Sequence, residues 1–198
     1  MASRGEQTRR RLLEAAETVF ARHGYHEASI VKITEAAGVA QGTFYLYFRT
    51  KAQVFEELVG DLNRRLGRAI TERAAPARGR VEVERLSLLG HLEFTIGHPA
   101  LYRIIRQAEV ICPAATRRHY ERVCRAYASG LEAAMARGEI VAADPEVLAW
   151  SLMGIGEMIA VRLALRADRD RPGQDTLRAV VDQASAFIAR GLGAGPGV

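Results

Sequence analysis

Apolar residues recur at helical spacing along most of the chain, and no stretch shows the period-two alternation of a half-buried strand. The first helix is expected over about 6–23, because Leu12, Ala16 and Phe20 share one face and Gly24 suits a helix end. Caps and breakers divide the rest of the chain into further helices. We expect three at about 29–36, 41–47 and 51–73, one that ends near 97, one that begins at 99, and three more at 113–138, 145–166 and 175–191. This pattern predicts an all-α protein of about nine helices and no strands.

One clear linker, AAPARGR at 74–80, interrupts the helical pattern with Pro76 and Gly79. A second loop is expected at DRDRPGQD, 168–175. We therefore divide the chain into a compact three-helix unit at 1–50, a connecting helix and linker at 51–80, and an all-helical body at 81–198.

The segment SIVKITEAAGVAQGTFYLYFRTK, 29–51, has the layout of a helix-turn-helix motif, with the motif itself at about 29–48. Ile30 and Ile33 supply a buried face for its first helix, and Gly38 supplies the positive φ of a tight turn. In such motifs the second helix enters the major groove of DNA. The small and polar residues at its start suit a close approach to base edges and phosphates. A plain helical hairpin whose aromatic residues only pack is the alternative.

Five aromatic residues in and after this motif divide by helical spacing. Phe44 and Phe48 share one face and Phe55 joins them, so we assign these three to packing. Tyr45 and Tyr47 remain as outward candidates, because a tyrosine hydroxyl can donate to a phosphate oxygen.

Residues 8–55 closely resemble the DNA-binding domain of the TetR family of bacterial transcriptional regulators. The resemblance rests on TRRRLLEAAETVFARHGYHEAS and on IVKITEAAGVAQGTFYLYFRTKAQVF, about a quarter of the chain. It implies nine helices, a divergent ligand-binding body and two C-terminal helices for dimerisation. It also implies DNA contacts at the family's usual positions, to which we add Lys32 of the same motif: Ser29, Lys32, Gln41, Gly42, Thr43, Tyr45, Tyr47 and Lys51.

Two positions depart from the family pattern. Ala40 stands where serine is usual, which removes a hydroxyl cap from the second helix and about 1 kcal/mol of stability at its start. Gln41 stands where lysine is common, and its amide suits a bidentate contact with adenine. We therefore expect an operator that differs from those of relatives.

The net charge lies almost entirely in the N-terminal part. The chain of 198 residues carries 28 Lys+Arg and 23 Asp+Glu, a formal net charge of +5. Residues 1–80 hold 14 basic and 9 acidic side chains, whereas residues 81–198 hold 14 of each. This distribution favours an anionic partner for the first part of the chain. Four arginines either reach DNA or form a solvated face: Arg4, Arg9, Arg10 and Arg11.

The remaining chemistry favours a soluble cytoplasmic protein that is not an enzyme. Cys112 and Cys124 are too few for a disulfide framework, and the N-terminus has no signal-peptide core. The longest apolar run, 147–165, is interrupted by Glu157 and Arg162, so we interpret it as a buried helix of a soluble protein. The sequence shows neither a G-x-S-x-G nor an H-E-x-x-H motif, and we expect no cofactor and no metal site.

The family resemblance implies a small-molecule pocket within the body. Glu157 is the sharpest candidate, since a carboxylate in an apolar helix needs a partner: Arg106, Arg162 or a donor on the effector. An acyl-CoA, a fatty acid or an aromatic acid is the effector class that similar family members suggest. Together, the aromatic residues and flexible methionines suit such a ligand, although taken singly each of them is more often a core residue than a ligand contact. The effector-binding candidates are Phe94, Tyr102, Ile105, Arg106, Glu109, Tyr120, Tyr127, Trp150, Met153, Glu157 and Met158.

An apolar stripe on the last helix predicts a homodimer interface, formed together with the small-residue-rich helix at 147–165. The stripe consists of Leu177, Val180, Val181, Ala184, Phe187 and Ile188. The combined features predict a ligand-responsive transcriptional repressor that binds a palindromic DNA operator as a dimer and is released by a small apolar, acyl or aromatic effector. One alternative is an all-helical ligand carrier or enzyme whose N-terminal unit does not bind DNA. Another is an activator that uses the same DNA contacts.

Overall fold

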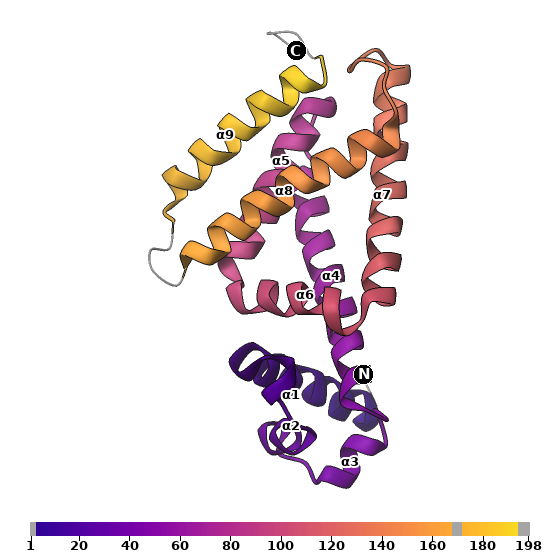
Figure 1. The fold of residues 1–198 in the computed structure, drawn as a ribbon, viewed down its shortest axis with the longest axis vertical. Coiled ribbons are helices and arrows are strands. Elements are labelled where there is room, and N and C mark those ends of the chain that lie inside the picture. The colour runs from indigo at the N-terminus through magenta and orange to yellow at the C-terminus, as the bar shows by residue number, and fades with distance from the viewer. Residues whose placement is uncertain (1–2, 168–171, 194–198) are drawn as a thin grey trace. The chain divides into compact units, whose positions relative to one another are not determined.

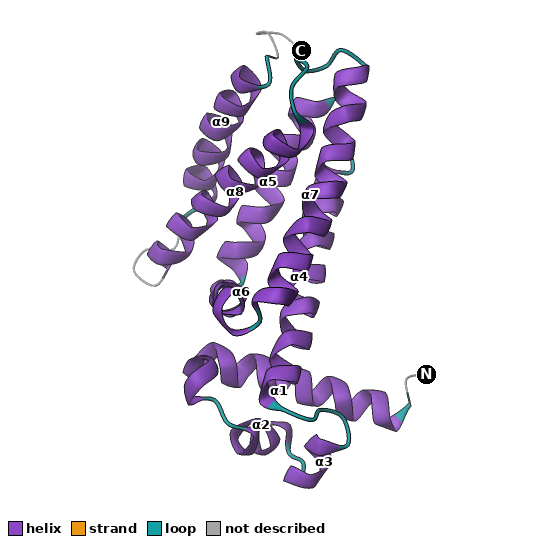
Figure 2. Ribbon diagram, turned by 45° about the vertical axis from the view of Figure 1, so that its right-hand side comes forward, coloured by secondary structure: helices purple, strands orange, loops and turns teal. Residues whose placement is uncertain are grey.

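A computed structural model describes residues 3–167 and 172–193, so residues 168–171 of the loop expected at 168–175 lie outside the described residues. Within these two ranges the chain forms nine α-helices and no strand (Figures 1 and 2). The all-α prediction is confirmed. The helices are α1 (Arg4–Glu27), α2 (Ile30–Ala37), α3 (Gln41–Tyr45), α4 (Lys51–Ala74), α5 (Arg80–Gly97), α6 (Pro99–Ile111), α7 (Pro113–Ala136), α8 (Pro145–Ala167) and α9 (Gln174–Gly191).

Local capping interactions fix several of these helix ends. The backbone N–H of Glu6 donates to Ser3 Oγ at 3.2 Å, and the Ser3 N–H donates to the Glu6 carboxylate at 2.6 Å, which starts α1 slightly earlier than expected. Gly24, at φ 70°, interrupts the helical geometry near the end of α1. Asp144 Oδ1 accepts from two backbone N–H groups at the start of α8, as its position before Pro145 predicts.

The chain divides into two compact units that do not follow the chain order. The first unit contains Met1–Arg64 and Ala100–Arg117, and the second contains Arg65–Pro99 and Arg118–Val198. Our division at residue 80 assigned all of α6 to the body, whereas most of α6 belongs to the first unit, together with α1, α2, α3 and most of α4. A hydrogen bond joins α6 to α1 within this unit: the backbone N–H of Tyr25 donates to Gln107 Oε1 at 2.8 Å.

Aromatic residues form the centre of the first unit. Phe44, Phe48 and Phe55 are all fully buried, as the helical spacing predicted. The rings of Phe20 and Phe55 meet edge to face at 5.0 Å, and those of Phe44 and Phe48 lie 5.5 Å apart. This core joins α1 and α3 to the first half of α4 and so orients the surface of α3.

In the second unit, α5 packs against α8 and against α9. This packing corrects the predicted dimer stripe, because Leu177, Val181 and Ile188 are buried within the protomer itself. Val180 and Ala184 are half-buried, and Phe187 is 60% exposed. The buried residues of α9 have the helical spacing of a stripe that faces the core. The same spacing is expected of a stripe that faces a second subunit, so the sequence alone does not distinguish the two.

The prediction that 147–165 is a buried helix is wrong for this chain alone. Residues 145–165 of α8 are long and apolar enough to cross a membrane, with a mean hydropathy of 1.5, but only 22% of that stretch is buried. Met158 and Leu165 are exposed, at 64% and 76%. The helix therefore presents an apolar outer face as well as the face that packs on α5.

Candidate nucleic-acid interface and effector body

Local interactions build the helix-turn-helix motif. Ser29 Oγ caps α2 by accepting from the Lys32 backbone N–H at 3.2 Å. Gly38 ends α2 at φ 62°, a left-handed conformation that glycine adopts without strain. The N–H of Val39 donates to the Thr34 carbonyl at 3.0 Å and closes the turn. Ala40 begins α3 with no side-chain cap, as expected for the missing serine hydroxyl.

The predicted contacts of α3 lie on an open surface. Gln41, Gly42 and Tyr45 are exposed, and Thr43 and Tyr47 are half-buried. A Cβ added to Gly42 would meet no atom within 4 Å, so the backbone there is accessible to a large partner. The sequence analysis overlooked Leu46, which is 78% exposed between the two tyrosines. The position of Leu46 between Tyr45 and Tyr47, which we predict to face outward, was the feature of the sequence that could have indicated its exposure.

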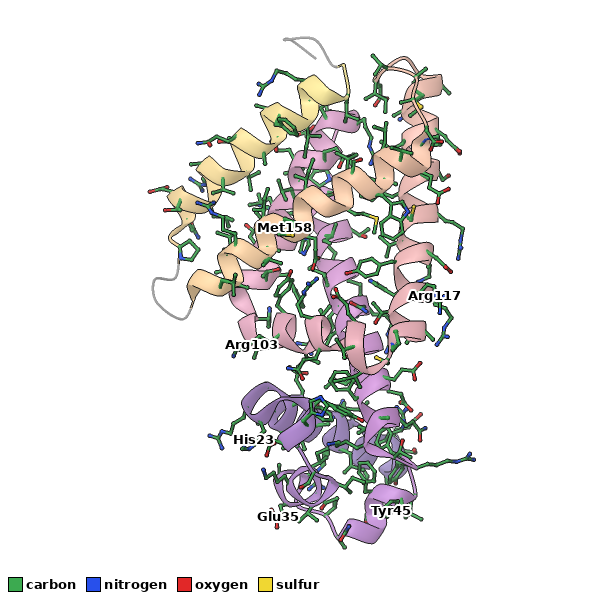
Figure 3. All side chains as sticks on the ribbon, viewed as in Figure 1. His23, Glu35, Tyr45, Arg103, Arg117 and Met158 are labelled. Atoms are coloured by element: carbon green, nitrogen blue, oxygen red, sulfur yellow. The ribbon has the colours of Figure 1, made fainter. Side chains whose placement is uncertain are left out.

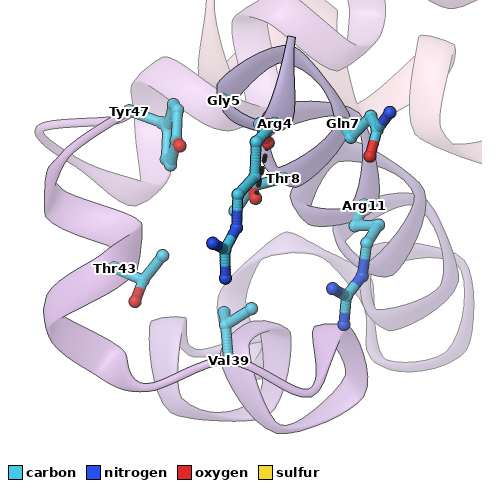
Figure 4. Close-up of a pocket in the computed structure, with 8 residues that line it drawn as sticks. All are labelled: Arg4, Gly5, Gln7, Thr8, Arg11, Val39, Thr43 and Tyr47. Carbon is cyan, nitrogen blue, oxygen red and sulfur yellow. Dashed lines mark hydrogen bonds between the residues drawn. The ribbon is translucent and has the colours of Figure 1, made fainter. Parts of the chain in front are cut away.

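A groove lies between the start of α1 and the helix-turn-helix (Figure 4). Its volume is about 550 Å³, and the arginines of α1 bring positive charge to the two hydroxyl-bearing residues that we predict to contact DNA. Arg11 is also part of the motif's structure, since its Nη2 donates to the Ala37 carbonyl at 2.6 Å. The lining residues are Arg4, Gly5, Gln7, Thr8, Arg11, Val39, Thr43 and Tyr47.

The structure separates the four N-terminal arginines. Arg4 and Arg11 line the groove. Arg9 forms an ion pair with Glu57 and lies over the Phe48 ring, 5.2 Å from its centroid, so it serves the core of the unit. Arg10 is exposed and lies 3.6 Å from Glu14, one helical turn away.

Lys51 has a structural role that the sequence analysis did not anticipate. Its ammonium group donates to the backbone carbonyls of Tyr25 and Ala28 at 2.8 Å each, and to that of His26 at 3.3 Å. It also lies 4.5 Å from the centroid of the Tyr25 ring. These three bonds match the three donors of an ammonium group. Lys32, by comparison, is exposed and donates to the Glu27 carbonyl at 3.0 Å.

The effector-binding candidates fall in both units. Tyr102, Ile105, Arg106 and Glu109 belong to the first unit, where Arg106 Nη1 donates to Glu109 Oε1 at 2.7 Å. The remaining candidates belong to the second unit, where Met153 packs against the core and Met158 is exposed. Figure 3 labels Met158 on α8. The candidates of the second unit are Phe94, Tyr120, Tyr127, Trp150, Met153, Glu157 and Met158.

Tyr127 belongs to a buried polar network. Its hydroxyl donates to Glu84, which is also ion-paired with Arg80 and is only 3% exposed. The Arg80 guanidinium lies 5.0 Å from the centre of the Tyr127 ring. Burial, followed by the neighbouring Glu84 carboxylate, raises the pKa of Tyr127 strongly. The sequence analysis missed Glu84, although its spacing of four residues from Arg80 was a visible signal.

The carboxylate of Glu157 acts on two histidines of neighbouring helices, His91 on α5 and His119 on α7. Burial lowers the pKa of His91, and Glu157 opposes that effect. Burial and then the Arg122 guanidinium lower the pKa of His119, again against Glu157. The sequence analysis had considered only arginines as partners within the protein. Among the described residues, no group of three or more His, Cys, Asp or Glu is arranged to hold a metal ion.

Comparisons with known proteins agree with this architecture. Residues 12–58 match the family model described as bacterial regulatory proteins, tetR family. A curated relative, the uncharacterized HTH-type transcriptional regulator YdgC of Bacillus subtilis, is 43% identical over 72 residues. That alignment covers 36% of this chain and 36% of the relative, so it spans about a third of the relative's length.

Two solved structures match nearly the whole chain. A TetR-like transcriptional regulator from Rhodococcus sp. RHA1 has a TM-score of 0.72 and 25% identity, covering 98% of this chain and 100% of that one. The transcriptional regulator FadR from Bacillus subtilis, in complex with stearoyl-CoA, has a TM-score of 0.77 and 21% identity, covering 92% and 98%. The N-terminal domain of this chain therefore belongs to the TetR family of bacterial regulatory proteins, and its helical fold resembles that of TetR-like regulators over nearly the whole chain.

Proposed function

We propose that this protein is a ligand-responsive transcriptional repressor that binds a palindromic DNA operator as a homodimer. The observation that carries this proposal is the open surface of α3 beside a groove lined by Arg4 and Arg11. An exposed short helix with accessible backbone suits the major groove, and the neighbouring cations suit the phosphates beside it. A cytoplasmic location follows from this function.

The side chains of the motif divide into base-reading and phosphate-binding roles. Gln41 and Thr43 face base edges, and Gly42 allows close approach of the backbone. Ser29, Lys32, Tyr45 and Tyr47 bind phosphate oxygens around the edge of this surface. Lys51 adds positive charge at the same edge, although its N–H donors hold the end of α1 in the free protein.

Dimerisation rests on the apolar outer face of α8 and α9. Its exposed members include Val147, Met158 and Leu165 on α8 and Phe187 on α9. Burying this face against a second copy removes apolar surface from water, which favours association. Two recognition helices about 34–36 Å apart can then read half-sites one helical turn apart.

The effector is a small apolar, acyl or aromatic molecule that binds within the body. The relative crystallised with stearoyl-CoA supports an acyl ligand, and the Tyr120–Trp150 ring pair at 5.9 Å supports an aromatic one. Effector binding releases the operator by favouring a conformation with lower DNA affinity. The effector can shift the equilibrium between the two conformations only by the difference in its binding free energy for them.

A fluorescence-anisotropy titration tests the DNA-binding function. The full-length protein should bind DNA from upstream of its own gene more tightly than a scrambled duplex of equal length at the same salt concentration. Replacing Thr43→Ala together with Tyr47→Phe should reduce that preference. Thr71→Ala, at an exposed position on α4, is the matched control and should leave binding unchanged.

The same titration separates the proposal from a ligand carrier with an inert N-terminal unit. Equally weak binding to both duplexes, unaffected by the double substitution, would rule out sequence-specific regulation. Binding that is specific but increases transcription in a reporter assay would indicate an activator.

A further inference from the structure

Leu46 is the most exposed large apolar side chain of the helix-turn-helix, at 78%, whereas Phe44, two residues earlier, is fully buried. Leu46 directly follows α3 and continues its helical geometry, with φ −71° and ψ −22°. Its backbone N–H donates to the Thr43 carbonyl at 3.3 Å. Two residues turn a helix by about 200°, so Leu46 points away from the core that Phe44 enters.

The surface of α3 beside Leu46 is open. Gly42 lies one helical turn before Leu46, so the two residues share a face of the helix. Gly42 is exposed, and a Cβ added there would meet no atom within 4 Å. Thr43 and Tyr47 lie to one side, where they line the groove beside α1 (Figure 4). Leu46 therefore stands on the outer face of α3, next to accessible backbone.

The charges beside this face indicate what covers it. Of the described residues that line the adjoining groove, two are arginines, Arg4 and Arg11, and none is acidic. A surface of this charge is complementary to the phosphates of DNA. When a recognition helix enters the major groove, the residues that point away from the protein core meet the edges of the bases. This places Leu46 against a base edge.

A leucine side chain can make only one favourable contact at that edge. The bases present hydrogen-bond donors and acceptors to the major groove, and the methyl group of thymine is the one apolar group among them. Leucine neither donates nor accepts hydrogen bonds, so against any other edge it would cover polar atoms without replacing their bonds to water. Leaving such atoms unsatisfied costs free energy. The position that faces Leu46 therefore favours thymine.

We propose that Leu46 contacts the 5-methyl group of one thymine in each half-site and so helps to determine the operator sequence. The proposal rests on the DNA-binding function above and adds an apolar contact to the base-reading residues Gln41 and Thr43. The contact depends on the methyl group and not on the hydrogen-bonding atoms of the base. Burying one methyl group contributes a factor of about four in affinity for each half-site.

Deoxyuridine scanning tests this contact, because replacing thymine by uracil removes only the methyl group. The full-length protein first selects its operator from a random duplex library, so the regulated gene need not be known. Each thymine position of the selected operator is then replaced in both half-sites, and affinity is measured by fluorescence anisotropy at constant salt concentration. We expect one position at which the loss of the methyl group lowers affinity about fourfold for each half-site.

Variants of Leu46 assign the methyl contact to this residue. Leu46→Ala should bind the thymine and deoxyuridine duplexes equally at that position, because the shorter side chain no longer reaches the base. Leu46→Met remains apolar and long, so it should keep the preference for thymine. Val110→Ala, on α6, is the matched control, since Val110 is an apolar residue that is 81% exposed in the same unit. Circular dichroism confirms that each variant is folded.

Two results would overturn this inference while leaving the regulatory function intact. One is specific operator binding in which no thymine position depends on its methyl group. The other is a methyl effect of the same size in Leu46→Ala and in the unaltered protein, which would assign the contact to another residue. Failure to select any operator, with equal binding to all duplexes, would overturn the regulatory function and this inference together.

Discussion

Lys51 makes two contacts with Tyr25: its ammonium group donates a hydrogen bond of 2.8 Å to the Tyr25 carbonyl oxygen, and it lies 4.5 Å from the centroid of the Tyr25 ring in a cation–π contact. The Tyr25 ring also packs on Phe55, 4.9 Å away, within the core of the first unit. Lys51 begins α4 and Tyr25 lies just after the interruption of α1 at Gly24. This contact therefore fixes the chain immediately before Ser29, where α2 starts.

Replacing Lys51→Met should destabilise the first unit by about 2 kcal/mol, because three carbonyl groups lose a charged donor. Thermal unfolding monitored by circular dichroism measures this loss. Lys32→Met, which removes one exposed bond, is the control and should cost much less. DNA affinity should also fall, while the salt dependence of binding changes by less than the one unit expected for a full phosphate contact. A full unit of change with unaltered stability would show that Lys51 acts mainly on phosphate.

Gln41→Ala should relax the choice of base without affecting folding. Gln41 is exposed at the first position of α3, where its amide suits adenine. Loss of a bidentate contact lowers discrimination at that base pair by about 1–3 kcal/mol. Binding to a library of single-base operator variants measures this change. A uniform loss of affinity across the library would instead indicate a phosphate contact.

Phe187→Glu combined with Met158→Glu should give a folded monomer. Both side chains are exposed in the protomer, so the added charges meet a low-dielectric environment only in the dimer. Sedimentation velocity measures the oligomeric state, and circular dichroism confirms the fold. Val181→Glu serves as contrast, because this residue is 1% exposed and a charge there should unfold the second unit. A dimer that survives the double substitution would place the interface elsewhere.

The stability of the second unit should decrease in mild acid. His91 and His119 have pKa values lowered from 6.5 in the folded state, mainly by burial, so the unfolded chain binds protons first. Their contribution is fully present above about pH 6.5 and is lost as the pH falls through the lower folded-state pKa values. Urea unfolding at several pH values measures the slope. His91→Gln should flatten it, and an unchanged slope in that variant would contradict the prediction.

Local features of the sequence predicted the helices and the binding motif. Gly38 occupies the left-handed turn, Ala40 leaves α3 uncapped and Asp144 caps α8, as neighbouring residues alone indicated. These features depend on interactions within a few residues, so they can be derived from the chain order. The fully buried Phe44 and Phe48 also follow from helical spacing.

Contacts between distant segments could not be predicted in this way. Periodicity identified an apolar stripe on α9 but not its partner, and only the packing on α5 showed that Val181 faces the protomer's own core. The bond from Tyr25 to Gln107 joins residues 82 positions apart, and it accompanies the placement of α6 in the first unit.

The sequence by itself determined an all-α chain with a DNA-binding motif near its N-terminus, because helix periodicity, caps and turn glycines act over short distances. Only the tertiary structure decided the roles of Lys51 and Glu157. The ammonium of Lys51 donates to carbonyls more than twenty residues away, and the carboxylate of Glu157 raises the pKa of histidines on two other helices against the effect of burial. Such partners depend on how helices pack in space, and that packing is not encoded in the spacing of residues along one helix.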